Sequence, residues 1–345
     1  MIPIQNIYYM LSYAFQVLNE QGYKNIATEQ FNNTGELMAA ILEKGIAIQI
    51  KRGLGKEYIL QTEALSSLRG KIDIAESIKT QSMLRKQLIC TYDEFSVNSI
   101  MNRIIKSTVE LLLRSNISKQ RKKNLRKLMV YFSEVDFIDL YTVNWNVQYN
   151  RNNQTYRMLI SICYLVVKGL LQTQSNGHTK LMDFLDEQRM CRLYEKFILE
   201  YYRREFKNQI TANASQIPWQ LDNEENSMLP VMQSDIMLQS DEKVLIIDAK
   251  YYEHSTQVQF DKHTIHSGNL YQIFTYVKNK EYELREKDHT VSGMLLYAKT
   301  DEEIYPNNVY QMSGNQITVR TLDLNLPFDE IAGQLNTIAK THFDL

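Results

Sequence analysis

The strand predicted over residues 243–252 constrains the fold of this chain more than any other feature of its sequence. Val244, Leu245, Ile246 and Ile247 form an unbroken apolar run that leads directly into Asp248. A strand without polar alternation is buried on both faces, and sheets of that kind are covered by helices on both sides. The run therefore predicts an α/β (α+β) fold with a central mixed sheet flanked by helices.

Further elements are predicted on both sides of this strand along the chain. Helical periodicity over 188–206 is followed by alternating apolar segments typical of strands, by a helix that Asn269 would cap, and by a last helix that starts near Pro327. The strands are expected at 209–221, 231–238, 243–252, 292–299 and 315–324, a hairpin turn at 239–243, and the two later helices at 269–280 and 327–343. The order is helix, three strands, helix, strand.

The first half of the chain has a different pattern. Helical periodicity predicts helices over 98–114 and 156–172. Between residues 45 and 75 the pattern favours strands instead, in GIAIQI, KEYILQTEAL and LRGKIDIAESI, with glycines as turn positions. We expect an N-terminal mixed α/β domain over 1–155 and a second domain over 156–345.

Composition restricts the cellular compartment in which the chain is expected. Three widely spaced cysteines, Cys90, Cys163 and Cys191, argue against a disulfide framework or a zinc site and for a reducing cytoplasm. No apolar run approaches the roughly 20 residues of a membrane span, and the first residues lack the basic lead of a signal peptide. The net charge of −1 disfavours a chain that binds nucleic acid without help.

The residues that carry chemistry are Asp235, Asp248 and Lys250. Strand side chains alternate, so Asp248 and Lys250 share one face, and the hairpin brings Asp235 to the same edge. Ala249 is small, which leaves its backbone carbonyl open to an ion. Two carboxylates and a carbonyl are hard oxygen donors suited to Mg²⁺, and Lys250 can orient or deprotonate an attacking water. A lone Asp-x-Lys after a strand is, however, more often a structural salt bridge.

Neighbouring residues favour a catalytic site over that salt bridge. Gln272 and Tyr276 are four residues apart and therefore share a face of the next helix. Glu195 on the preceding helix is a further candidate metal ligand, with Glu200 as the alternative. Because these two glutamates are five residues apart, they are not expected to point the same way.

The arrangement resembles a known nuclease signature. Asp235 followed by Asp248-Ala249-Lys250 resembles the PD-(D/E)xK motif, with Ser234 in place of the usual proline. Gln272-Ile-Phe-Thr-Tyr276 resembles the QxxxY motif of the RecB-like branch. Segments along nearly the whole chain are similar to the McrC family, namely 2–15, 69–78, 92–108, 193–205 and 246–252.

This resemblance implies a Mg²⁺-dependent endodeoxyribonuclease, with Mn²⁺ as a possible substitute, in a type IV, methylcytosine-dependent restriction system. Asp235, Asp248, the Ala249 carbonyl and Glu195 would bind the metal, and Lys250, Gln272 and Tyr276 would complete the catalytic set. The implied partner is a hexameric McrB-like AAA+ GTPase that recognises modified cytosine in double-stranded DNA. The N-terminal domain would enter the partner's ring and stimulate GTP hydrolysis, leaving the PD-(D/E)xK nuclease domain outside.

Alternatives stay open. The chain has no GxxxxGK[ST] and is expected to bind no nucleotide alone, so RGLGKEY (52–58) is interpreted as a hairpin turn. Three functions are considered for the whole chain: the cutting subunit, a regulatory GTPase activator with a weak or silent nuclease, or a stand-alone RecB-like nuclease. The intact Asp-Asp-Lys set argues against the regulator, and the near-neutral charge against the stand-alone enzyme.

Three smaller features are also ambiguous. The basic run 114–127 contacts phosphates or an acidic partner, or is a solvated turn between helices. His254, His263 and His266 are expected in an exposed loop, because their spacing does not fit a tight zinc site. Of Tyr251 and Tyr252, one is expected in the core and the other near the DNA groove.

Overall fold

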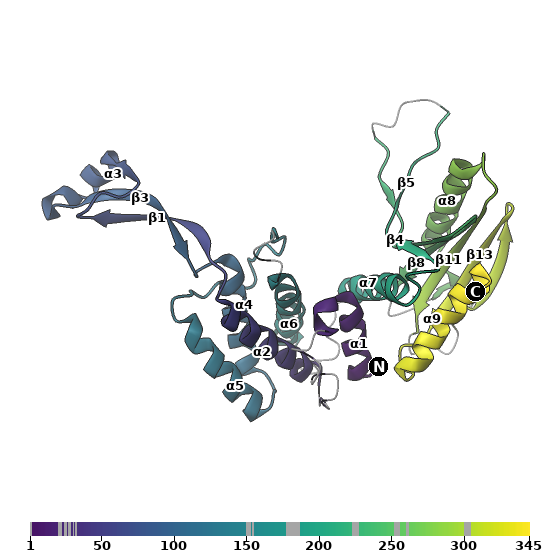
Figure 1. The fold of residues 1–345 in the computed structure, drawn as a ribbon, viewed down its shortest axis with the longest axis horizontal. Helices are drawn as coiled ribbons and strands as arrows, with labels where there is room; N and C mark the ends of the chain where they lie inside the picture. The colour runs from purple at the N-terminus through teal and green to yellow at the C-terminus, as the bar shows by residue number, and fades with distance from the viewer. Residues whose placement is uncertain are drawn as a thin grey trace. The chain divides into compact units, whose positions relative to one another are not determined.

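The computed structural model describes residues 2–19, 23, 26, 29, 31, 33–149, 153, 155–176, 187–222, 228–251, 256–259, 262–299 and 305–345 (Figure 1). The chain forms two compact units. We call Met1–Ala27 with Leu185–Leu345 the sheet unit, and Thr28–Phe184 the helical unit. Among the described helices, none has the length and apolar character needed to cross a lipid bilayer.

A six-stranded mixed sheet forms the centre of the sheet unit, in the order β12-β13-β11-β8-β7-β4. β8 (Lys243–Lys250) is an interior strand, parallel to β11 (Thr290–Ala298) and antiparallel to β7 (Ile236–Ser240). The outer strands are β13 (Asn315–Leu322), β12 (Asn308–Met312) and β4 (Thr211–Asn213). The expected hairpin is confirmed, because Ser240 pairs with Lys243 across the turn.

Helices cover both faces of this sheet, as the apolar run in β8 predicts. α8 (Ser267–Leu284) packs on one face, where Val244 and Ile246 share a core with Ile273 and Val277. The alternate residues of β8 are equally buried, and α7 (Glu187–Glu205) and α9 (Phe328–Phe343) contact the strand. Figure 1 shows α8, α9 and one end of α7 beside the sheet strands. Successive strand residues face opposite sides, so α7 and α9 cover the face away from α8.

The first helix of the chain, α1 (Ile4–Ala14), belongs to the sheet unit. The buried side-chain amide of Asn6 donates to the carbonyls of Leu324 and Leu326, both at 2.8 Å. Tyr9 stacks on Phe328 with ring centroids 4.4 Å apart. These contacts span more than 300 residues of sequence, which is why local patterns placed α1 in the wrong unit.

The helical unit combines a helix cluster with a small sheet. The helices are α2 (Thr34–Arg52), α4 (Ile100–Arg114), α5 (Lys119–Met129) and α6 (Tyr156–Asn176). The sheet has the order β1-β3-β2, from β1 (Glu57–Leu65), β3 (Leu88–Ser96) and β2 (Lys71–Asp73), with α3 (Ile74–Lys79) after β2. Within this unit, the small sheet and α3 project away from the helices (Figure 1).

The boundary near residue 155 does not coincide with a division between the compact units. The hydroxyl of Tyr156, at the start of α6, donates to Asn102 Oδ1 at 2.8 Å and accepts from the Gly55 amide at 2.7 Å. α6 also packs on α2 and α4. Residues 156–176 therefore belong to the helical unit, and the sheet unit resumes at Leu185.

Several local predictions were wrong. GIAIQI (45–50) lies inside α2 rather than in a strand, because short apolar runs fit either element and the capping contact from Asn33 to the Glu36 amide favours the helix. Gly53 ends α2 with φ of 92° and β1 follows at Glu57, so RGLGKEY connects a helix to a strand and is no hairpin turn. His266, not Asn269, occupies the N-cap position of α8.

The strands of the sheet unit are also more interrupted than expected. The segment 209–221 contains only β4 and β5 (Gln216–Ile217), and 231–238 is divided between β6 (Met232–Gln233) and β7. The remaining short elements are η1 (Gln16–Asn19), η3 (Ser82–Arg85), η4 (Val130–Phe132), β9 (Thr256–Gln259) and β10 (Lys262–Ile265). His263 lies in β10 and His266 precedes α8, so neither occupies the expected loop, and His254 lies outside the described residues.

Candidate active site

The β7–β8 hairpin brings Asp235 and Asp248 together, as the sequence predicts. Ile236 pairs with Ile247, so the next position outward sets Asp235 opposite Asp248. Asp235 Oδ2 accepts a hydrogen bond from the Ala249 amide at 2.9 Å. Ser234 is buried, and its own amide donates to the Ser215 carbonyl at 3.0 Å. A proline at 234 would lack that amide, so the serine adds a backbone contact that the usual signature residue cannot make.

Lys250 lies between Asp248 and α8. Its Nζ is 2.9 Å from Oδ1 and 2.8 Å from Oδ2 of Asp248. The same ammonium donates to Gln272 Oε1 at 3.4 Å, and Gln272 Nε2 donates to the Tyr276 hydroxyl at 2.8 Å. The chain Asp248–Lys250–Gln272–Tyr276 therefore forms one polar network, which fixes the lysine at the edge of the buried carboxylate.

Burial raises the pKa of both aspartates and so disfavours their simultaneous ionisation. Asp248 is 1% exposed, and burial raises its pKa to about 7, against the opposing charge of Lys250. Burial also raises the pKa of Asp235, while Lys250 and the Ala249 amide oppose that rise. Interaction between the two neighbouring carboxyl groups lowers the pKa of Asp235 and raises that of Asp248. The pair is a strong candidate for binding a cation.

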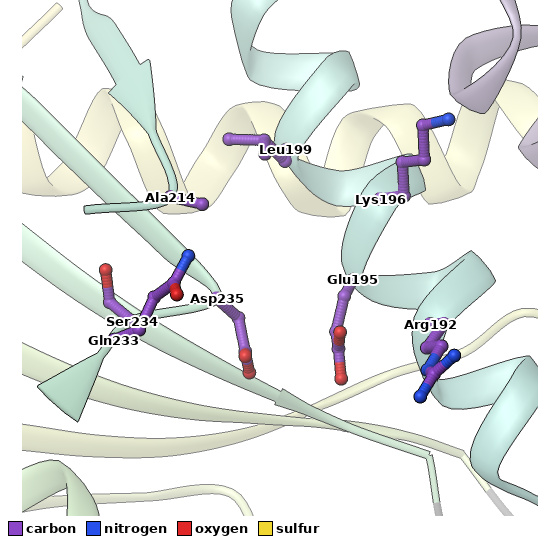
Figure 2. A pocket seen from close by; sticks show the side chains of 8 residues that line it. All are labelled: Arg192, Glu195, Lys196, Leu199, Ala214, Gln233, Ser234 and Asp235. Atoms are coloured by element: carbon purple, nitrogen blue, oxygen red, sulfur yellow. The ribbon is translucent and has the colours of Figure 1, made fainter. Parts of the chain in front are cut away.

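Glu195 of α7 lies beside this pair, and Glu200 does not. Burial raises the pKa of Glu195, with the charge of Asp235 as the next cause. In Figure 2 the carboxylates of Glu195 and Asp235 point the same way along a pocket of about 410 Å³. Glu200 instead pairs with Arg203 at 2.8 Å. The geometry thus favours Glu195 over its alternative.

Two residues near Glu195 were not predicted from the sequence. The Cys191 thiol donates to Glu195 Oε1 at 3.0 Å and lies 3.8 Å from the Ala249 carbonyl oxygen. Burial raises the pKa of this thiol to about 12, so it stays protonated and remains a donor. Arg192 lines the pocket next to Glu195 (Figure 2). Cys191 could have been predicted, because it is four residues from Glu195 on one helix and therefore shares its face.

The donor set suits a hard divalent cation. Asp248 Oδ2 is buried and receives no hydrogen bond from the described residues, although the Lys250 ammonium lies beside it. The described residues contain no cluster of three His, Cys, Asp or Glu side chains already arranged around a metal position. Asp235, Asp248 and the Ala249 carbonyl are the oxygen donors at this strand edge, and the Cys191 thiol lies between the Ala249 carbonyl and Glu195.

The predicted tyrosines are only partly described. Tyr251 packs edge-on against Tyr194, with ring centroids 6.3 Å apart, on the side of the strand end that faces α7. Tyr194 is fully buried, so Tyr251 lies at the margin of the core. Tyr252 lies outside the described residues, and the expectation that one of the pair lines a DNA groove stays a prediction.

Comparison with known proteins defines the class to which this fold and site belong. Residues 5–298 match the family described as McrBC 5-methylcytosine restriction system component. The chain is also 30% identical over 329 residues to the Type IV methyl-directed restriction enzyme EcoKMcrBC of Escherichia coli (strain K12), covering 94% of this chain and 93% of that protein. The chain belongs to the McrBC family of restriction system components, which confirms the resemblance inferred from the sequence.

Two solved structures are also similar to the chain. One is a half-complex of Thermococcus gammatolerans McrB AAA+ hexamers with bound McrC, at 18% identity and a TM-score of 0.48, covering 97% of this chain and 76% of that chain. The other is the Thermococcus gammatolerans McrBC complex, at 21% identity and a TM-score of 0.41, covering 59% of each chain. These TM-scores are too low to establish a shared fold.

Proposed function

We propose that the chain is the DNA-cleaving subunit of a type IV, methylcytosine-dependent restriction system and that its sheet unit carries a PD-(D/E)xK nuclease site. The observation that carries the proposal is the buried pair of Asp235 and Asp248, with Lys250 held against it. A structural salt bridge needs one carboxylate for one lysine. Here a second carboxyl group is buried beside the first, and a metal ion would stabilise both in the ionised form that burial disfavours.

The residues of the site divide the work of phosphodiester hydrolysis among them. Asp235, Asp248 and the Ala249 carbonyl would hold Mg²⁺, or Mn²⁺ as a substitute, which supplies positive charge to the scissile phosphate. Lys250 orients the attacking water or stabilises charge on the phosphate, and Gln272 and Tyr276 hold Lys250 in place. Arg192, exposed at the pocket, is placed to contact a neighbouring phosphate of the DNA strand.

The proposed partner is an McrB-like AAA+ GTPase hexamer, bound by the helical unit. The projecting part of this unit exposes large apolar side chains, including Tyr58 of β1 (74% exposed) and Leu84 of η3 (81% exposed). Others on the same sheet, on α3 and on η3 are Leu60, Ile74, Ile78, Met83 and Phe95. Such a surface is unfavourable in water and is typical of a site for another protein. We infer that it enters the ring and stimulates GTP hydrolysis.

The test is cleavage of methylated plasmid with Mg²⁺ and GTP, with and without the GTPase partner. Asp248→Ala is expected to reduce cleavage by two orders of magnitude or more while GTPase stimulation survives. Glu195→Ala should also weaken cleavage, whereas Glu200→Ala, a matched change on the same helix, should not. Equal cleavage by the native protein and Asp248→Ala would overturn the site assignment.

A purely regulatory role is the second candidate, favoured by the same exposed apolar surface. It predicts that a Leu60→Ser, Leu84→Ser double variant loses GTPase stimulation while Asp248→Ala leaves every function of the system intact. In the nuclease proposal, Asp248→Ala abolishes DNA cleavage instead. The two functions are therefore separated by one pair of variants.

A further inference from the structure

α5 presents a basic stripe on its outward face. Lys119, Lys123, Arg126 and Lys127 are all exposed. Successive residues are four, three and one positions apart, which places all four on one side of the helix. Exposed Tyr131, four residues beyond Lys127, continues this face beyond the end of the helix. We call these four basic residues the α5 stripe.

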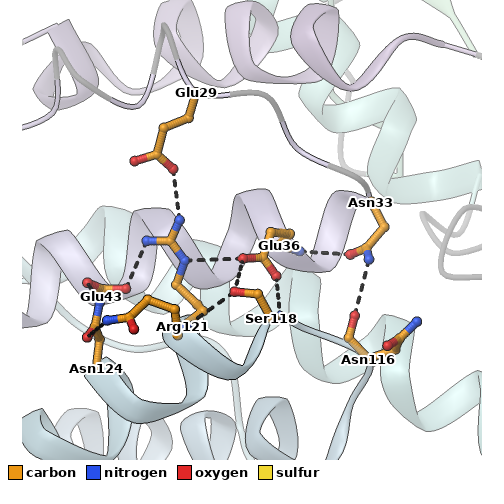
Figure 3. A network of polar contacts seen from close by, with 9 residues as sticks. Glu29, Asn33, Glu36, Glu43, Asn116, Ser118, Arg121 and Asn124 are labelled. Atoms are coloured by element: carbon orange, nitrogen blue, oxygen red, sulfur yellow. Dashed lines mark hydrogen bonds and ion pairs between the residues drawn. The ribbon is translucent and has the colours of Figure 1, made fainter.

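The opposite face of α5 fixes the helix to its own unit. Leu125 is fully buried, and the Arg121 guanidinium is held by Glu29 and Glu43, both at 2.8 Å, with Glu36 at 3.5 Å. Figure 3 shows these carboxylates converging on Arg121 from the elements packed against α5. Ser118 caps the helix and also donates its hydroxyl to Glu36 at 2.8 Å. The stripe is therefore presented by a rigidly anchored helix.

The stripe places four positive charges on one exposed surface of α5. In the described part of the chain, none of its four residues forms an ion pair, in contrast to Arg114 and Arg121 nearby. Lys119 and Lys123, like Lys123 and Lys127, are like charges four residues apart, which repel. The first turn of α5 holds no acidic residue, so Lys119 also opposes the helix dipole. An external polyanion would relieve all of these repulsions.

We propose that the α5 stripe is a second DNA-binding surface, which contacts the phosphate backbone of duplex DNA away from the nuclease site. A rigid row of cations on one helix matches a regular row of phosphates and requires no base contact, so binding is independent of sequence and of methylation. Tyr131 adds a hydroxyl donor at the end of the row. This surface rests on the proposed function, in which DNA is the substrate. The helical unit would then help to bind that DNA.

The test measures binding of the full chain to a short unmethylated labelled duplex by fluorescence anisotropy, in EDTA and over a range of salt. The stripe variant carries Lys119→Gln, Lys123→Gln, Arg126→Gln and Lys127→Gln. A control variant carries Lys51→Gln, Arg52→Gln, Lys71→Gln and Arg85→Gln, four exposed basic residues of the same unit. Circular dichroism melting of both variants verifies that they fold like the native chain.

The stripe variant is expected to bind at least about tenfold more weakly, with a plot of log K against log salt that is shallower by roughly one for each lost phosphate contact. The control should stay within about twofold of the native chain. Equal loss in both variants, or none in either, overturns the proposal. So does unchanged DNA binding with lost GTPase association, which would make the stripe a dock for an acidic protein. Asp248→Ala should bind like the native chain, so failure of the nuclease site is seen separately, as lost cleavage.

Discussion

At the scale of single residues, the buried carboxyl of Asp248 links the candidate site to stability. Its pKa rises from 3.8 to about 7 on folding because of burial. Between those values the folded chain binds a proton that the unfolded chain does not, so without metal the free energy of unfolding must fall as pH rises through this window. The loss is complete above the folded pKa and on the order of a few kcal/mol.

Asp248→Asn is expected to remove the contribution of Asp248 to this pH dependence, because an amide cannot ionise, while Asp235 and Glu195 still titrate. Urea unfolding at pH 5 and pH 8 in EDTA measures it, and at pH 8 the variant should be the more stable protein. Asp344→Asn is the control, since the pKa of Asp344 is lowered by its bond to Lys243 and the residue does not titrate in this window. The same slope in native protein and Asp248→Asn would contradict the raised pKa of Asp248.

Cys191 is expected to act on cleavage through Glu195. Cys191→Ala removes the donor to Glu195 Oε1 and should lower cleavage by about three- to tenfold, because misplaced groups at an active site lose rate. Cys191→Ser keeps a hydroxyl donor and should restore most of the rate. The measurement is cleavage of methylated plasmid at saturating partner. A serine variant no better than the alanine variant would show that the thiol only fills space.

At the scale of elements, Gly293 sets the distance between α8 and the sheet. A Cβ at this position would lie 2.8 Å from Ile273 Cγ1 and 2.9 Å from both Val277 Cγ2 and Ile317 Cδ1. Gly293→Ala is therefore expected to destabilise the sheet unit by about 1–3 kcal/mol through overpacking. Gly333→Ala on α9, where a Cβ would meet nothing within 4 Å, is the control and should be neutral or stabilising. Equal unfolding midpoints for both variants would mean that α8 retreats from the sheet without strain.

The elements around the site were the most predictable part of the chain. The apolar run of β8, the hairpin turn after β7 and the four-residue spacing of Gln272 and Tyr276 are local signals, and all three lead to observed contacts. The helical course of residues 45–50 was not predictable from its short apolar run, because that run fits both periods. Arg192 carries no local signal, since its position at the pocket follows from the packing of α7.

At the scale of the whole molecule, two buried asparagines mark the two compact units. Asn6 donates to two carbonyls of the sheet unit, those of Leu324 and Leu326. Asn102 donates to two carbonyls of the helical unit, those of Gly55 at 2.9 Å and Val97 at 2.8 Å. Asn6 reaches residues more than 300 positions away, and Tyr156 of α6 donates its hydroxyl to Asn102. Local sequence patterns cannot relate these segments, which is why the expected boundary at residue 155 did not match either unit.

Replacing either asparagine is expected to destabilise only the unit that contains it. Asn6→Ala leaves the buried Leu324 carbonyl and the partly buried Leu326 carbonyl without their donor. Asn102→Ala does the same to two partly buried carbonyls of the helical unit, so each variant should lose about 1–3 kcal/mol of unfolding free energy. Hydrogen exchange on the full chain measures where the loss appears. Asn6→Ala should speed exchange in α1 and around 324–331, and Asn102→Ala in α4 and the start of α6, with the other unit unchanged. Faster exchange throughout the chain in either variant would mean that the two units unfold as one.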